Sequence, residues 1–169
     1  MARSIAALVV VLGTLGVSAA PAAAQARPAP AVEFAGGALL FPDDGTVTEG
    51  FVGAAGRFYL SPLLSVGPEF AYIAGSNHSH LMLTGNLTVD LAKPGSAVVP
   101  FVVAGAGLFQ TNENLPVTGG SFTHNEGAFT AGGGVRALVG DRVIVGAEAR
   151  LGWEAHVRFN GFLGFRLGK

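Results

Sequence analysis

The chain has 169 residues, of which 50% are hydrophobic and only 12% are charged, and its mean hydropathy is +0.49. Soluble domains carry about 25% charged residues, so this composition is too apolar for an ordinary soluble surface and too poor in charge for a disordered chain. The formal net charge of −1 supplies no basic field for a phosphate backbone, which argues against a nucleic-acid partner. The absence of cysteine excludes disulfides and cysteine-ligated zinc.

The N-terminus has the pattern of a secretory signal peptide. Arg3 supplies a positive charge, residues 5–17 form a nearly unbroken apolar run, and small residues follow over 18–24. The run is shorter than the ~20 residues of a spanning helix, so we favour cleavage, after Ala24 or Ala26, over a retained anchor. The resulting prediction is a signal peptide over 1–26, a short extended lead-in over 27–31, and one domain over 32–169.

The rest of the chain contains no candidate for a membrane-spanning helix. Its longest apolar segment, 98–109, is too short and is interrupted by Pro100, Gly105 and Gly107. If the chain spans a membrane, only a closed β-barrel remains, because lipid cannot satisfy the hydrogen-bonding groups of an open sheet edge.

Eight segments have the period-two alternation of strands and are bounded by turn residues. The sequence therefore predicts an all-β, eight-stranded, antiparallel, up-and-down transmembrane barrel. The predicted strands are 32–41, 50–60, 65–74, 81–91, 99–110, 128–139, 142–154 and 157–168.

The predicted connections alternate in length and polarity. The second, fourth and sixth are short or moderate turns, whereas the first, third and fifth are longer and more polar. In a bacterial outer-membrane barrel, the former face the periplasm and the latter project outward. The fifth connection, predicted as a polar loop over 111–127, is the most prominent. The seventh, near residues 155–156, is short.

The parity of charge within the predicted strands is the strongest indication of the fold. In the seventh strand, Val145 and Leu151 share an apolar face, whereas Glu148 and Arg150 share the opposite face. Across all strands, one face is free of charge, and the other is predicted to form a lumen charge network of Arg57, Glu69, Asp90, Arg136, Glu148, Arg150, Arg158 and Arg166. Near-balanced arginines and acids among glycines suit a narrow interior better than a soluble surface, because buried charges need partners and small neighbours.

Aromatic residues of the apolar face are predicted to form two interfacial belts. The belt near the outward ends consists of Tyr72, Phe109, Phe129, Trp153 and Phe159. The belt near the inner ends consists of Phe34, Phe58, Phe101 and Phe165.

With its signal peptide, alternating strands and the glycine-rich segments SVGPEF, VVAGAGLF and TAGGGVRALVGDRV, the chain resembles the small eight-stranded outer-membrane β-barrel family of Gram-negative-type bacteria. The resemblance implies location in the outer membrane, with its lipids and the barrel-assembly machinery as partners. Members commonly end on an aromatic residue, whereas this chain ends on Lys169, with Phe165 as the last aromatic residue. Pro68 also lies inside a strand, where we expect a bulge or a late strand start.

Residues that carry chemistry are sparse. The segment from Gly132 to Ala137 matches G-x-G-x-x-A, but no helix follows it, so we predict no cofactor. Ser76 and Ser121 have no nucleophile-elbow motif or fixed spacing to a histidine, so we predict no enzymatic activity. Two imidazoles in the third connection suggest a metal site, but a solvated polar loop is the favoured interpretation. The histidines considered are His78, His80, His124 and His156.

The leading functional hypothesis is a non-enzymatic, structural or surface-interaction protein that acts through its outward loops and has a charge-paired, largely plugged lumen. The first alternative is a narrow pore or transporter for small solutes. The second is a soluble, secreted, lipocalin-like binder of small ligands, with the two faces of the sheet reversed.

Overall fold

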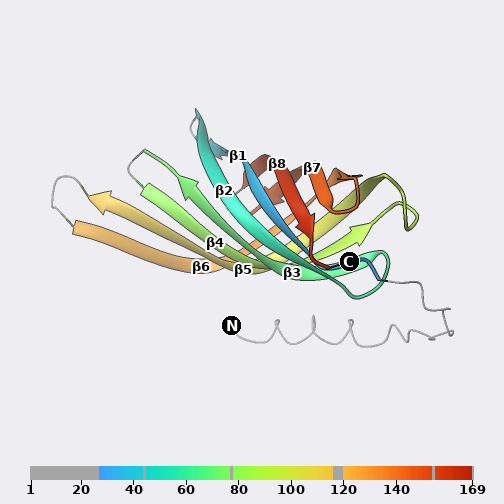
Figure 1. Cartoon of the computed structure of the whole chain (residues 1–169). Coiled ribbons are helices and arrows are strands. Elements are labelled where there is room, and N and C mark those ends of the chain that lie inside the picture. Colours follow the sequence, from blue (N-terminus) through green and yellow to red (C-terminus); the bar gives the residue numbers. More distant parts are fainter. Residues whose placement is uncertain (1–26, 44, 77, 116–119, 154, 169) are drawn as a thin grey trace, which may run out of the picture.

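The computed structural model describes residues 27–169 except 44, 77, 116–119, 154 and 169. The predicted signal peptide lies outside the described residues. Eight strands account for most of the described chain (Figure 1). They are β1 (Ala31–Asp43), β2 (Gly45–Tyr59), β3 (Leu64–Ala74), β4 (His78–Asp90), β5 (Val98–Leu115), β6 (Gly120–Val139), β7 (Val143–Gly152) and β8 (His156–Arg166).

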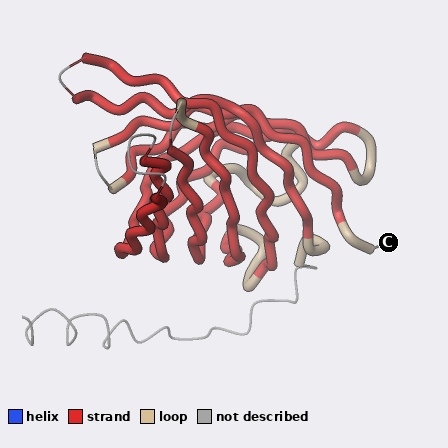
Figure 2. The backbone as a smooth tube through the Cα atoms, turned by 90° about the vertical axis from the view of Figure 1, so that its left-hand side faces the viewer, coloured by secondary structure: helices blue, strands red, loops and turns tan. Residues whose placement is uncertain are grey.

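The strands form one closed barrel in which each strand pairs with its neighbours in sequence and β1 pairs with β8. All these pairs are antiparallel, which confirms the predicted fold class. The tube in Figure 2 shows the tilted strands curling around a common axis. No helix in the described part of the chain is long and apolar enough to cross a membrane.

The odd-numbered connections lie together at one end of the barrel, here called the hairpin end. The even-numbered connections, the start of β1 and the end of β8 lie at the other, here called the terminal end (Figure 1). The strands extend further toward the hairpin end than the sequence predicted. The predicted polar loop over 111–127 is instead largely paired, with the β5–β6 ladder continuing to Leu115 and Gly120. Both faces of this extension are polar, so the alternation that marks a strand is missing from its sequence.

The barrel is apolar outside and charged inside. In β8, for example, Phe159, Leu163 and Phe165 are exposed on the outer wall, whereas Arg158 and Asn160 are buried in the interior. This orientation is opposite to that of a soluble, lipocalin-like binder, whose apolar face would line the interior. The alternative of a lipocalin-like binder with the two faces of the sheet reversed is therefore wrong.

Pro68 interrupts one ladder without producing a bulge. It pairs with Gly85 of β4, but no pairing with β2 is present between Ala55 and Phe58. The β2–β3 register is the same on both sides of this gap, so no extra residue has been inserted. Proline lacks the amide hydrogen that the missing rungs need, and the barrel accommodates this loss by leaving two rungs unpaired.

Candidate functional site: the charged lumen

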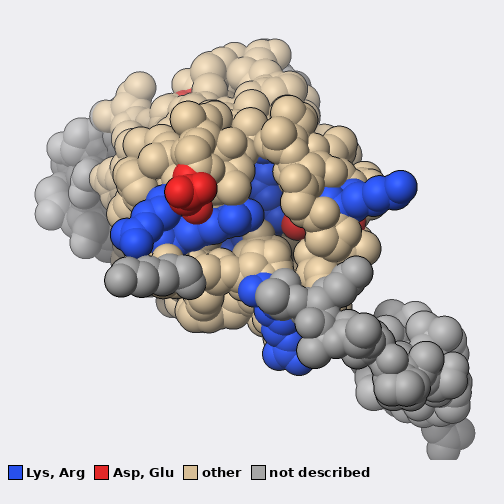
Figure 3. Space-filling model, turned by 45° about the vertical axis from the view of Figure 1, so that its right-hand side comes forward, with Lys and Arg blue, Asp and Glu red and all other residues tan. Residues whose placement is uncertain are grey.

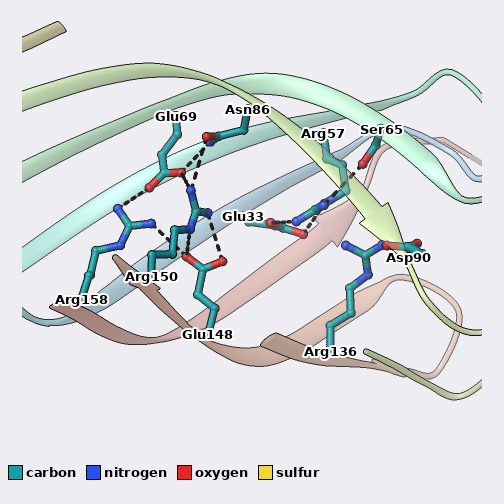
Figure 4. Close-up of polar contacts among 10 residues, drawn as sticks. All are labelled: Glu33, Arg57, Ser65, Glu69, Asn86, Asp90, Arg136, Glu148, Arg150 and Arg158. Atoms are coloured by element: carbon teal, nitrogen blue, oxygen red, sulfur yellow. Dashed lines mark hydrogen bonds and ion pairs between the residues drawn. The ribbon is translucent and has the colours of Figure 1, made fainter. Parts of the chain in front are cut away.

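A ring of four ionised side chains lies near the middle of the lumen (Figure 4). Glu69 of β3 contacts both Arg150 of β7 and Arg158 of β8, at 2.9 and 2.6 Å. Glu148 of β7 contacts the same two guanidinium groups, at 2.8 and 2.9 Å. Asn86 of β4 donates to Glu69 at 2.6 Å and accepts from Arg150 at 3.3 Å. Each carboxylate is therefore shared by two arginines, and each arginine by two carboxylates.

The ring joins opposite walls of the barrel. In a barrel of eight strands in sequence order, β3 lies four strands from β7, halfway around the circumference. The contacts between Glu69 and Arg150 therefore cross the interior. Because the side chains on both sides are less than a tenth exposed, a break in this ring would leave a charge in a dry environment.

A second ion pair lies between β1 and β2, nearer the terminal end. Arg57 donates from Nε and Nη2 to the two carboxylate oxygens of Glu33, at 3.0 and 2.8 Å. Its Nη1 is 3.4 Å from Ser65 Oγ. The same guanidinium lies 5.6 Å from the ring centroid of Phe101, within the range of a cation–π interaction.

A third ion pair, between Arg136 of β6 and Asp90 of β4, lies at the terminal end. The guanidinium of Arg136 is 5.4 Å from the Phe101 ring and 5.9 Å from the Tyr59 ring. Phe101 thus contacts the cations of both ion pairs. Within the described residues, these three groups bring together four arginines and four acids, so the interior network is electrically balanced.

Two clusters of apolar side chains fill the rest of the lumen. One layer, on the terminal-end side of the ring, consists of Ala31, Phe101, Val103, Ile144 and Phe162. The other, toward the hairpin end, consists of Leu39, Phe51, Ala71, Ile73, Met82, Phe109 and Ala128.

Glycines provide the room for these large groups. A Cβ atom on Gly134 would lie 2.8 Å from both Glu148 Cβ and Phe101 Cζ, and one on Gly132 would lie 2.9 Å from Arg150 Cγ. The G-x-G-x-x-A match therefore belongs to a strand, and its glycines accommodate the charge network and an aromatic ring.

Little space remains inside. Two cavities beside the ring and the Glu33–Arg57 pair have volumes of about 20 Å³ each, room for about one water molecule. A larger cavity of about 450 Å³ opens at the terminal end, where Asp90, Arg136 and Arg166 contribute to its lining. Figure 3 brings this side of the barrel forward and shows Lys and Arg side chains across it. The described lumen is thus open at this mouth and closed further in.

A separate polar cluster lies at the hairpin end. Glu49 of β2, His78 and His80 of β4 each offer a ligand atom, and these atoms lie within 4.8 Å of one another. The other two histidines do not join them: His124 stacks against Phe122, and Nδ1 of His156 bonds to the Trp153 carbonyl oxygen at 2.7 Å.

The structure places the predicted network residues inside the barrel, where seven of them form the ion pairs above and Arg166 lines the terminal mouth. Glu33 and Glu49 also lie inside the barrel, although neither was predicted from the sequence. Glu33 lies between apolar Val32 and Phe34, and this alternation indicates that its side chain faces inward. Glu49 precedes the predicted strand over 50–60, so the sequence placed it in a connection.

Two aromatic residues differ from their predicted positions. Phe101 and Phe109 are 2% and 3% exposed and lie in the lumen. β5 has no charged residue between Val98 and Gln110, and apolar residues occur on both of its faces. Its sequence therefore does not show which face points into the lumen. The other predicted belt residues are exposed on the outer wall: Phe34, Phe58, Tyr72, Phe129, Trp153, Phe159 and Phe165.

No protein-family model matches the chain, and no curated protein matches its sequence. Solved structures do match. Neisserial surface protein A is 13% identical, with a TM-score of 0.71, over 82% of this chain and 97% of that one. The N-terminal barrel domain of Pseudomonas aeruginosa OprF is 13% identical, with a TM-score of 0.62, over 81% and 97%. Ail, the attachment invasion locus protein of Yersinia pestis, is 12% identical, with a TM-score of 0.63, over 83% and 99%. Each is similar to this chain in fold.

Proposed function

Because this chain has the fold of the small eight-stranded outer-membrane β-barrels, we propose that it is a non-enzymatic protein of the bacterial outer membrane that presents its hairpin end to a surface partner. The filled lumen is the observation that carries this proposal. Three ionic groups and two apolar layers occupy the interior and leave cavities of about one water molecule. Such a barrel acts as a rigid anchor rather than a conduit.

The outer wall supports the proposed location. Large apolar side chains such as Val102, Leu108 and Leu163 are exposed around it, and an exposed apolar surface of this extent indicates contact with membrane or another protein. Because the barrel is closed, its apolar outer wall continues around the whole circumference. Outer-membrane lipids are the proposed partner that covers this wall. The barrel-assembly machinery is the proposed partner during insertion.

The β5–β6 hairpin is the part best placed to meet a surface partner, because it protrudes beyond the other hairpins (Figure 1). Its paired strands hold exposed side chains in fixed positions. Gln110 donates to Asn125 at 2.8 Å, and Thr123 donates to Asn112 at 3.0 Å. Phe122 is 55% exposed there. A rigid polar ribbon with an exposed aromatic residue suits protein or glycan contact better than solute passage.

The first test measures whether folding needs an amphiphile. The protein is expressed with its own N-terminal segment, purified from outer membranes, unfolded, and refolded with and without detergent micelles. We expect far-UV circular dichroism of β-structure, and a compact gel band that shifts on boiling, only with micelles. Folding in plain buffer would contradict the proposed membrane location.

The second test separates the anchor from the pore alternative. The refolded protein is reconstituted in planar bilayers, and single-channel current is recorded. We expect no discrete openings, because the ring of Glu69, Glu148, Arg150 and Arg158 and the apolar layers close the described lumen. Reproducible openings that change when Glu148→Gln is introduced would establish the pore and reject the plugged anchor.

A further inference from the structure

We propose that Glu49, His78 and His80 form a binding site for a divalent first-row transition-metal ion at the hairpin end. Two imidazoles and one carboxylate are a common donor set for zinc and for other ions of this series. The three ligand atoms lie within 4.8 Å of one another, so one ion can reach all of them after small side-chain movements. The inference is independent of the partner proposed above.

The backbone brings the three donors together. Glu49 lies at the start of β2 and the two histidines at the start of β4, so β3 separates them in the sheet. All three point into the barrel, on the same faces as buried Phe51 and Met82. The Gly75 amide donates to the His78 carbonyl oxygen at 3.0 Å, which holds the backbone of His78 beside the end of β3.

The neighbouring residues leave one oxygen of the Glu49 carboxyl group without a hydrogen bond. Its side chain is 3% exposed, and Oε1 is bonded to Nε2 of His78. Oε2 is buried without a hydrogen bond, and Nε2 of His80 lies 3.6 Å from it. A buried carboxylate oxygen without a donor is costly, and a metal ion between Oε2 and the imidazoles would remove that cost.

The histidines are oriented as metal ligands are. Nδ1 of His80 bonds to Thr111 Oγ1 at 2.9 Å, which turns Nε2 toward Glu49. A hydrogen bond at the ring nitrogen that does not bind the metal fixes the orientation and the tautomer of a ligating histidine. Gly75 leaves the necessary space, because a Cβ atom there would lie 2.6 Å from Glu49 Oε1. His78 is about one-third exposed, so solvent can reach the site.

The charge of this end favours a cation. The segments 41–50, 75–80, 110–127 and 153–157 contain no Lys or Arg. Of the acidic side chains in these segments, the structure describes those of Glu49 and Glu126. Because these segments supply no ammonium or guanidinium group to compete, the Glu49 carboxylate favours a cation, and the imidazoles select a transition metal over a hard cation such as Ca²⁺.

The test is titration of the untagged protein, purified from outer membranes in detergent, with Zn²⁺ alone in competition with a chromophoric chelator. We expect about one zinc ion per chain with micromolar or tighter affinity, and no binding of Ca²⁺ under the same conditions. Glu49→Gln and His78→Gln should each weaken binding at least about tenfold. Thr111→Val, which removes the hydrogen bond to Nδ1 of His80, should weaken it by about ten to a hundred times.

His124→Gln is the matched control, since this exposed histidine lies at the same end of the barrel but outside the cluster. It should bind zinc as the wild type does. Each variant is first checked for its compact, heat-modifiable gel band. If Glu49→Gln does not fold, the more exposed His78→Gln decides the result. Wild-type zinc binding that is absent, that survives both substitutions, or that His124→Gln weakens equally would overturn the proposal.

Discussion

Arg158 and Glu69 form a 2.6 Å ion pair across the lumen, although they belong to β8 and β3, three strands apart around the barrel. Removal of either side chain would leave the other with one ionic partner in place of two. The pair also shares its neighbours, because Arg150 contacts Glu69 and Glu148 contacts Arg158. The ring therefore acts as one unit that ties β3, β7 and β8 together through the interior, in addition to the hydrogen-bonded ladders.

Neutralising one carboxylate of this ring should destabilise the barrel. Glu148→Gln preserves shape but leaves Arg150 and Arg158 with a single carboxylate between them, so we expect the free energy of unfolding in detergent to fall by about 3–5 kcal/mol. Urea denaturation followed by tryptophan fluorescence measures it. Asp141→Asn, in an exposed turn, is the control and should change stability by less than about 0.5 kcal/mol. An unchanged midpoint for Glu148→Gln would show that the ring is hydrated or unpaired.

Coupling within the ring should exceed that of a surface ion pair. A double-mutant cycle of Glu148→Gln and Arg158→Gln isolates the pairwise term. We expect a coupling free energy above about 1 kcal/mol, because both side chains are buried, whereas exposed pairs give about 0.2–1 kcal/mol. Additive effects of the two substitutions would show that they act independently.

A methyl group added at Gly146 should destabilise the barrel, whereas one added at Gly161 should not. The Cβ atom at Gly146 would lie 2.8 Å from Phe162 Cε1, inside the packed lumen. At Gly161, on the adjacent strand, the nearest atom is the Gly146 carbonyl oxygen at 3.8 Å, an ordinary contact. We expect Gly146→Ala to cost about 1–3 kcal/mol. Gly161→Ala should be neutral or stabilising by up to about 1 kcal/mol, and equal effects in denaturant melts would contradict the packed lumen.

An arginine on the outer wall should reveal where lipid begins. Leu83 is 51% exposed between Phe70 and Leu108 on the paired strands, near the middle of β4. In lipid vesicles, Leu83→Arg should cost about 2–4 kcal/mol, as for a charge near the bilayer midplane. Leu167→Arg, just beyond the end of β8, should cost about 0–1 kcal/mol. Small, equal costs would place both residues in water.

The positions of charged residues along each strand determined how much of this fold could be predicted from the sequence. In strands that carry charged residues, such as β7 with Glu148 and Arg150, the inward face was predicted correctly. A charged side chain is unfavourable on the lipid-facing wall of such a barrel, so it must face the lumen. β5 carries none in its central part, so Phe101 and Phe109 were placed on the wrong face. The Glu49 cluster could not be predicted, because its members meet only through the register of β2, β3 and β4.

Trp153, the single tryptophan of the chain, provides a direct measure of how deep the barrel lies in a bilayer. It is exposed on the outer wall at the hairpin end, where it packs edge-on against Phe129 with ring centroids 5.3 Å apart. Its indole nitrogen lies 3.3 Å from Glu126 Oε2, so one edge of the ring is polar and the other apolar.

Such a side chain favours the interface between headgroups and acyl chains. We expect blue-shifted emission in vesicles and the strongest quenching by lipids brominated near the headgroup, with weaker quenching by lipids brominated near the chain ends. Phe129→Leu is the control for ring packing and should leave the depth unchanged. Strong quenching by aqueous iodide together with no quenching by any brominated lipid would place the hairpin end outside the membrane interface.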